Sequence, residues 1–90
     1  MATSIAEYAV RATMSMDGGS QHESIRSLIH KIMVHVTGLR WTVMVADYIA
    51  FSGAFNEWYF LFIDGHAIFL GRTINGNSVT VVDNVARVNQ

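Results

Sequence analysis

The residues of this chain that could move protons or bind metals are four histidines and seven carboxylates. His30 and His35 are five residues apart on an expected helix, about 140° around its axis, so they do not converge on one metal as histidines four apart do. His66 directly follows Asp64-Gly65, where it is either a general acid beside Asp64 or, as we favour, a turn residue without a chemical role. The carboxylates stand singly along the chain. The sequence therefore predicts no catalytic residue, no metal site and no cofactor.

The sequence gives equally little support for anion binding or for cysteine chemistry. The run Asp17-Gly18-Gly19-Ser20 precedes an expected helix N-terminus, where backbone amides can hold an anion. No phosphate-loop Lys-Ser/Thr follows it, so a plain loop and cap is the favoured interpretation. The absence of cysteine excludes a disulfide framework, a thiolate metal cluster and a thiol nucleophile. An enzyme would need His66, Asp64 or Asp47 in a cleft formed on oligomerisation.

Length and composition indicate one small domain with a substantial core. The chain has 90 residues, of which 51% are apolar and 14% charged, against roughly 25% charged in an average soluble domain. Its net charge is −1 and its six cations are scattered, so no basic stripe for nucleic acid is expected. No run approaches the length of a membrane-spanning helix, and the first residues lack a signal-peptide pattern. These features predict a soluble cytoplasmic protein.

The clearest local element is a helix over residues 21–37. Ser20 and Glu23 stand three apart as in a capping box, and Gly38 supplies a left-handed stop. The side opposite the apolar one is polar, so the segment predicts an amphipathic helix that covers a sheet. The residues that recur at the spacing of one helix face are Ile25, Leu28, Ile29, Ile32, Met33 and Val36.

Residues 5–16 fit two patterns. Apolar residues alternate with polar ones over this stretch, as in a strand, whereas Ser4 and Glu7 form a candidate capping box with helical spacing after it. A strand separates the apolar and polar sets more cleanly, because a helix would leave Val10 and Met14 on its outer side. We therefore favour a strand and keep a helix as the alternative.

The remainder of the chain is predicted to form strands. The first of them is apolar on both faces, which is typical of a central strand. The fold class is therefore α+β, with one amphipathic helix packed on a four- to five-stranded antiparallel sheet. The element order is β-α-β-β-β-β, or the same with a helix first. The strands are expected over residues 41–46, 58–63, 66–72 and 78–82.

Two tight turns set the register of these strands. Asp64-Gly65 and Asn75-Gly76 are two-residue hairpin signals, because a type I′ turn needs positive φ at both central residues. Two-residue turns determine which side chains share a face. The predicted pairs are Ile63 with His66, Leu61 with Ile68, Tyr59 with Leu70, Glu57 with Arg72, Leu70 with Val81 and Arg72 with Val79.

Both faces of the predicted sheet are apolar, one mainly aliphatic and the other aromatic. Four large aromatic side chains present on the order of 600 Å², and one helix cannot cover two faces. The N-terminal segment or another chain must therefore cover the aromatic face. Residues 48–55 are unusually apolar for a loop, and either continue the preceding strand into the core or contact another chain. The predicted protein interface comprises Tyr48, Phe51, Phe55, Trp58, Phe60, Phe62 and Phe69.

A set of hydrophobic landmarks links residues 24–72 to a known family. They are Ile25 and Ile29 on the helix, Trp41 and Val45 on the next strand, and the runs 59–63 and 67–70. This pattern resembles the small homodimeric dynein light chains. Here Ala46-Asp47 replaces the family's Gly and basic residue, its Thr-His-Glu run is absent, and residues 75–90 continue past its usual end. The family also has two helices before the Trp strand. The resemblance implies a dimer that exchanges residues 48–55 and binds extended peptides at a sheet edge.

Three hypotheses for function follow. The leading one is a non-enzymatic protein–protein interaction module, a homodimer joined through the aromatic face and residues 48–55. The second is a small viral or phage-type inhibitor that docks the same patch on a host enzyme. The third is a small enzyme or ligand-binding domain whose site forms on oligomerisation. Neither nucleic acid nor a membrane is expected as a partner.

Overall fold

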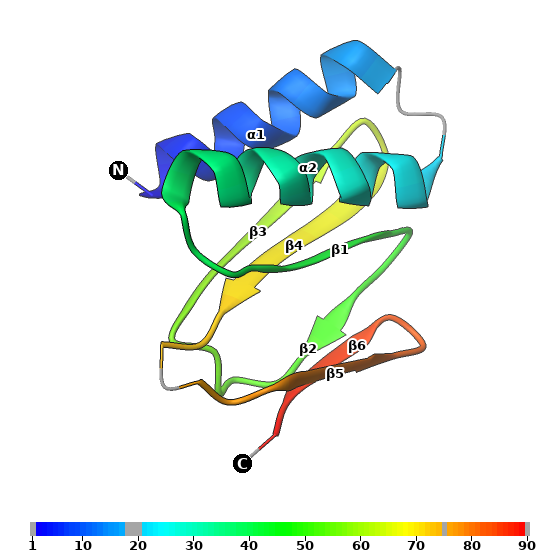
Figure 1. Ribbon diagram of the computed structural model, residues 1–90. Coiled ribbons are helices and arrows are strands. Elements are labelled where there is room, and N and C mark those ends of the chain that lie inside the picture. The colour runs from blue at the N-terminus through cyan, green and yellow to red at the C-terminus, as the bar shows by residue number, and fades with distance from the viewer. Residues whose placement is uncertain (1, 18–20, 75, 90) are drawn as a thin grey trace.

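The computed structural model describes residues 2–17, 21–74 and 76–89 of the chain. Figure 1 shows two helices on one side of a sheet of β1, β4 and β3, and a smaller sheet of β2, β6 and β5 on the other side. The predicted α+β class is confirmed, but the strands form two sheets rather than one. In chain order the elements are α1 (Ala2–Asp17), α2 (His22–Thr37), β1 (Thr42–Ala46), β2 (Ala50–Phe51), β3 (Glu57–Ile63), β4 (His66–Arg72), β5 (Val79–Val82) and β6 (Val85–Val88).

The N-terminal segment is a helix, so the favoured strand interpretation of residues 5–16 is wrong. Alanine is the best helix former and recurs through α1, which contains neither Gly nor Pro. Val10 and Met14, expected on the outer side of a helix, are buried, whereas Tyr8 is 63% exposed. Two helices therefore precede β1, and α1 packs against α2. The buried face of α1 consists of Ala6, Ala9, Val10, Thr13 and Met14.

The predicted helix over residues 21–37 is α2. It ends at Gly38, which has φ 69° and closes the last turn with its N–H, as predicted. The start differs, because the N-cap is Gln21 without a side-chain cap, and Ser20 lies outside the described residues. Glu23 instead accepts a hydrogen bond from Arg26 at 2.7 Å, which lowers the pKa of the Glu23 carboxyl from its ordinary value. The buried residues of α2 are Ile25, Ile29 and Met33.

The first sheet has β4 at its centre, between β1 and β3. All four predicted pairs around Asp64-Gly65, from Ile63 with His66 to Glu57 with Arg72, are confirmed. Asp64 and Gly65 have φ of 53° and 79°, as a type I′ turn requires. The expectation that residues 41–46 form a central strand is wrong, because β1 is an edge strand whose two faces are both covered.

Replacing Gly65 with valine is expected to weaken the β3–β4 hairpin. A Cβ at Gly65 meets no atom within 4 Å, so the cost arises from the backbone, which has φ 79°. The left-handed region costs an ordinary residue about 1–2 kcal/mol, and a β-branched residue more. Urea unfolding should show a larger loss of stability for Gly65→Val than for Gly65→Asn, since asparagine tolerates this region. Equal stability of the two variants would contradict this explanation.

The second neighbour of β4 is β1, so the predicted pairing of residues 78–82 with β4 is wrong. β5 turns at Asp83-Asn84 and pairs antiparallel with β6. Asp83 and Asn84 have φ of 52° and 62°, and both residue types tolerate the left-handed region, so they form a second tight turn. Asn75, half of the predicted Asn75-Gly76 turn, lies outside the described residues. β2 completes this sheet and runs parallel to β6.

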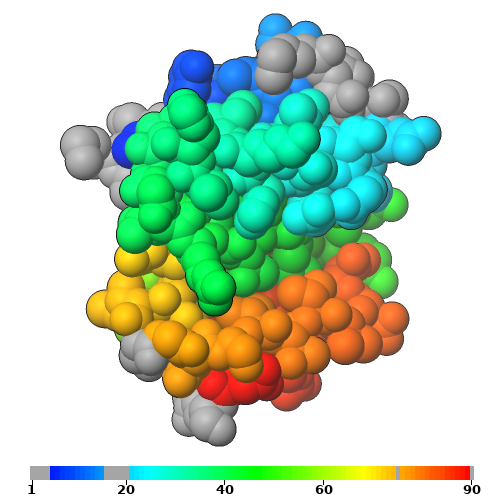
Figure 2. All heavy atoms as spheres, in the orientation of Figure 1, coloured from blue at the N-terminus to red at the C-terminus, as the bar shows by residue number. Residues whose placement is uncertain are grey.

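Hydrophobic clusters lie on both sides of the first sheet. The larger cluster joins the two helices to the aliphatic face of β1, β4 and β3. The smaller one joins the opposite face to the second sheet through Met44, Phe55, Phe69 and Ala86. Figure 2 shows the same order from outside, with α2 above and β5 and β6 below. The second sheet, rather than α1 as one alternative expected, covers this part of the aromatic face. Within the described ranges, neither helix has the length and apolar character needed to cross a membrane.

Candidate interaction surface

β3 carries a row of exposed aromatic side chains. Burial alternates along the strand, because Tyr59 and Leu61 pack toward the helices and the residues between them face the other way. On that outer side Trp58 is 47% exposed, Phe60 is 46% exposed and Phe62 is 66% exposed. These three side chains, which lie two residues apart on one face of one strand, form what we call the aromatic surface.

The second sheet stops at the border of the aromatic surface. The Phe51 ring of β2 stacks on that of Phe69, with centroids 4.4 Å apart, and also contacts Trp58 at 4.8 Å. Phe60 and Phe69 stand opposite each other in the β3–β4 pair, yet Phe69 is fully buried and Phe60 is not. The aromatic surface is therefore the uncovered continuation of the smaller hydrophobic cluster.

The seven residues predicted as an interface lie in three environments. Trp58, Phe60 and Phe62 form the aromatic surface, and Phe51 is half-buried at its border. Tyr48 is 75% exposed in the connection between β1 and β2, outside β3. Phe55 and Phe69 are 6% and 0% exposed, so their placement on an exposed face is corrected: both belong to the core beneath the second sheet.

Residues 48–55 lie along the chain's own second sheet. Ala50 N–H donates to the Asn84 carbonyl at 3.0 Å, and Ser52 N–H donates to the Ala86 carbonyl at 2.9 Å. Phe55 then enters the smaller cluster. The segment therefore does not continue β1, which ends at Ala46, and only its end at Phe55 enters the core as one interpretation expected. Its exchange between two chains, which the resemblance implies, stays a prediction.

A groove of about 310 Å³ lies between α1 and β3. Ala6 and Glu7 form its α1 side, and residues 58–61 form its β3 side. β3 is the last strand in the order β1-β4-β3, so its outer edge has no strand neighbour among the described residues. Free edges are templates for strand addition, and proteins usually protect them with lysine, proline or an inward charge. Residues 58–63 contain none of these.

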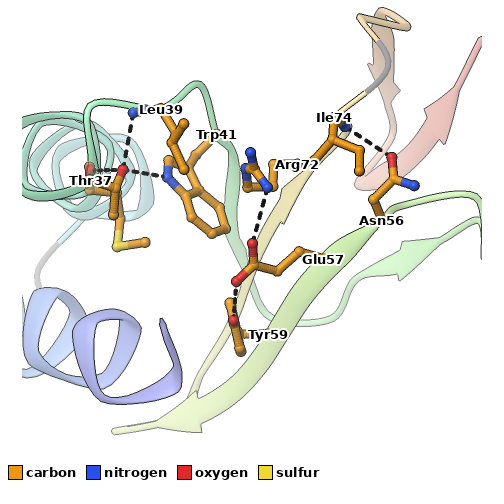
Figure 3. Close-up of polar contacts among 9 residues, drawn as sticks. Thr37, Leu39, Trp41, Asn56, Glu57, Tyr59, Arg72 and Ile74 are labelled. Atoms are coloured by element: carbon orange, nitrogen blue, oxygen red, sulfur yellow. Dashed lines mark hydrogen bonds and ion pairs between the residues drawn. The ribbon is translucent and has the colours of Figure 1, made fainter. Parts of the chain in front are cut away.

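Polar contacts fix the start of β3, as Figure 3 shows. The Glu57 carboxylate accepts hydrogen bonds from Arg72 at 3.2 Å and from the Tyr59 hydroxyl. The Arg72 guanidinium lies 5.9 Å over the Trp41 ring, whose N–H donates to the Thr37 hydroxyl at 2.9 Å. Glu57 is the one charged residue in the sequence of β3. Its pairing therefore leaves the strand without an uncompensated charge.

Sequence reasoning missed a cluster of titratable side chains at the opposite end of the sheet. The His22 ring on α2 lies edge-on to that of His66, with centroids 5.1 Å apart, and His22 Nε2 is 3.6 Å from Asp47 Oδ1. The pairing of Ala46 with Ala67 brings Asp47 beside His66, so only the unpredicted β1–β4 register would have revealed it. The Asp47 side chain is 85% exposed, which makes this a solvated pair rather than a shielded acid–base site. In the part of the chain that is described, no group of three potential ligands is placed to hold a metal.

A larger hollow of about 620 Å³ lies between the end of α2 and the approach to β5. Arg40, Trp41 and Arg72 are among its lining residues. Arg72 is already paired with Glu57, and the C-terminal end of α2 beside it carries partial negative charge, which disfavours an anionic ligand. The hollow is therefore poorly suited to an anionic ligand.

Comparison with known proteins found no match, whether among protein-family models, curated proteins or solved structures. The resemblance to dynein light chains therefore stays a prediction. The aromatic surface is the feature of this chain from which a function can be inferred.

Proposed function

We propose that this chain is a non-enzymatic protein–protein interaction module that forms a homodimer through the aromatic surface. The observation that carries the proposal is the row of Trp58, Phe60 and Phe62, each about half exposed or more on one side of a single strand. Aromatic side chains are enriched at protein interfaces and supply many of their energetically dominant contacts. A surface of this kind favours a protein partner over a small polar substrate.

The size of the aromatic surface supports an interface. Its exposed parts present on the order of 300 Å², at the lower end of the range for the largest apolar patch on a typical monomer, a patch that is often functional. Burying this area on both copies of a dimer contributes up to roughly 15 kcal/mol at about 25 cal/mol per Å². Association itself costs about 4–15 kcal/mol. The aromatic surface therefore drives dimerisation but needs further contacts for a stable complex.

Charge also favours a second copy as the partner. The aromatic surface is uncharged, Glu57 beside it is paired with Arg72, and the net charge of the chain is only −1. Two copies that meet at this face therefore bring no like charges into contact and repel each other little over longer distances. An inhibitor that docks on another protein would be expected to have a surface shaped to that protein's charges.

Light scattering or sedimentation is expected to give a dimer for the unmodified protein and a folded monomer for Phe62→Asp. Removing an interface anchor of this kind costs 2 kcal/mol or more, so the dissociation constant should rise at least about 30-fold. Val82→Asp is the matched control, because Val82 is 60% exposed on the second sheet and lies outside the aromatic surface. A monomer of 10.0 kDa for the unmodified protein at every concentration would contradict the proposal.

A further inference from the structure

We infer that the two copies join edge to edge, by antiparallel pairing of β3 with β3, in the register that places Phe60 opposite Phe60. This inference rests on the proposed homodimer and specifies how its chains meet. It predicts a continuous six-stranded sheet, with both aromatic surfaces side by side on one of its faces, so that the rings meet along the paired strands rather than stack face to face. The evidence is the free outer edge of β3, the direction of its backbone groups and the symmetry of its sequence.

The backbone groups of the aromatic residues point to the free edge of β3. In a hairpin closed by a two-residue turn, the pair next to the turn exchanges both backbone hydrogen bonds, and such pairs then alternate with unbonded ones. Ile63 and His66 are that first pair. The unbonded positions of β3 are therefore Trp58, Phe60 and Phe62. The backbone N–H and C=O groups of these residues point away from β4. The same three residues carry both the exposed rings and the exposed hydrogen-bonding groups.

One register uses all of these groups. An antiparallel partner strand forms bonded pairs only where outward-pointing residues face each other. With Phe60 opposite Phe60, Trp58 faces Phe62 of the partner strand, and Phe62 faces its Trp58, so all three residues pair. A shift of two residues leaves only two such pairs, and a shift of one leaves none. The twofold arrangement centred on Phe60 therefore forms the most hydrogen bonds.

The side chains of β3 are compatible with self-pairing in this register. On the aromatic side each cross-strand pair is aromatic on aromatic, a combination that stabilises antiparallel pairs. On the helix side Tyr59 faces Leu61 of the second copy. Glu57 faces Ile63, so no like charges oppose each other, and the Glu57 carboxylate keeps its own partner Arg72. A strand that reads nearly the same from its centre in both directions suits an isologous interface.

Stacking of the two faces alone gives too little area for a stable dimer. Stacked aromatic surfaces would bury on the order of 600 Å² in total, whereas stable interfaces bury about 1,200–2,000 Å². Edge pairing does not stack these faces; it buries the outer backbone edge of a seven-residue strand and the facing edges of the rings, and it brings the second copy to the groove of about 310 Å³ bordered by Glu7 of α1. It also satisfies the free edge that would otherwise remain open.

Amide hydrogen exchange on the unmodified protein tests this inference. At concentrations where light scattering shows a dimer, the amides of Trp58, Phe60 and Phe62 should exchange slowly, and they should lose this protection on dilution to the monomer. Tyr59 and Leu61 bond to β4 within the chain, so their amides should stay protected at both concentrations. A dimer in which the three aromatic amides exchange as fast as in the monomer would overturn edge pairing and leave the proposed homodimer intact. Absence of any dimer would overturn both.

Cysteine cross-linking tests the register, because the chain has no cysteine of its own. Paired residues in such a ladder have Cα atoms about 5.5 Å apart, within the range of a disulfide. Phe60→Cys should therefore cross-link to itself, and Trp58→Cys should cross-link to Phe62→Cys in a mixture, where Phe60 is retained. Trp58→Cys alone should not, because its two copies lie about 13 Å apart along the strands. Self-cross-linking of Trp58→Cys without the mixed product would overturn the register.

Discussion

Replacing Phe69 with aspartate is expected to unfold the whole domain, whereas the same change at Phe62 leaves it folded. Phe69 is fully buried, and its ring packs on Phe51 at 4.4 Å and on Phe55 at 5.0 Å. Loss of a buried Phe side chain costs about 3–5 kcal/mol, and a domain of this size has only about 5–15 kcal/mol of stability. Burial of an unpaired carboxylate adds a further penalty. The sum reaches or exceeds the stability of the domain.

Far-UV circular dichroism with urea unfolding measures this difference. Phe69→Asp should show no cooperative unfolding transition. Phe62→Asp should show a cooperative transition close to that of the unmodified protein at a concentration where it is a monomer. The control is closely matched, because both residues are phenylalanines on adjacent strands of one sheet, and Phe62 is 66% exposed. A folded Phe69→Asp protein would mean that the second sheet does not cover β4 in solution.

The β3–β4 hairpin shows what could be predicted from the sequence. Asp64-Gly65 fixes a two-residue turn through local backbone preferences, and the pairing up to Glu57 with Arg72 follows from it. The helix over residues 21–37 likewise follows from local periodicity and Gly38. α1 was misread because alanines and Thr13 lie on its buried face, so a pattern scored by hydrophobicity alone favoured a strand.

The second sheet could not be predicted in the same way. β2 has only two residues, and its partner β6 begins more than thirty residues later in the sequence, so no local pattern indicates their pairing. The Asp83-Asn84 turn was a readable signal, since both residues tolerate positive φ, and it would have paired β5 with β6.

The position of the candidate site depends on this second sheet. Phe60 and Phe69 are opposite each other and share a face, as the predicted register required. The predicted turns already placed the strand of Phe69 between two others, but the sequence contains no indication that a second sheet covers Phe69 and leaves Phe60 uncovered. The exposed row of Trp58, Phe60 and Phe62 therefore emerges only when the position of the second sheet is known. That position depends on contacts distant in sequence, such as the pairing of β2 with β6, which single-sequence periodicity does not encode.

Gly71 is expected to be the position where the smallest added group causes a large loss of stability. A Cβ there would lie 2.6 Å from Cζ of Phe69 and 2.8 Å from Cδ1 of Phe55, closer than real Cβ atoms approach. Both rings are buried and pack against each other, so neither can move freely. Overpacking of this kind costs about 1–3 kcal/mol. Glycine in this central strand thus makes room for the two rings.

Thermal unfolding of Gly71→Ala should show a melting temperature lower by about 4–8 °C for each kcal/mol lost. Gly53→Ala is the matched control, because a Cβ at Gly53 meets no atom within 4 Å and its φ lies outside the left-handed region. That variant should be neutral or stabilised by up to about 1 kcal/mol. If the clash with the rings is the cause, adding Phe55→Leu to Gly71→Ala should cost less than the two single changes together, since the smaller side chain leaves space for the new methyl group. Additive losses would contradict a contribution of the Phe55 ring to the clash.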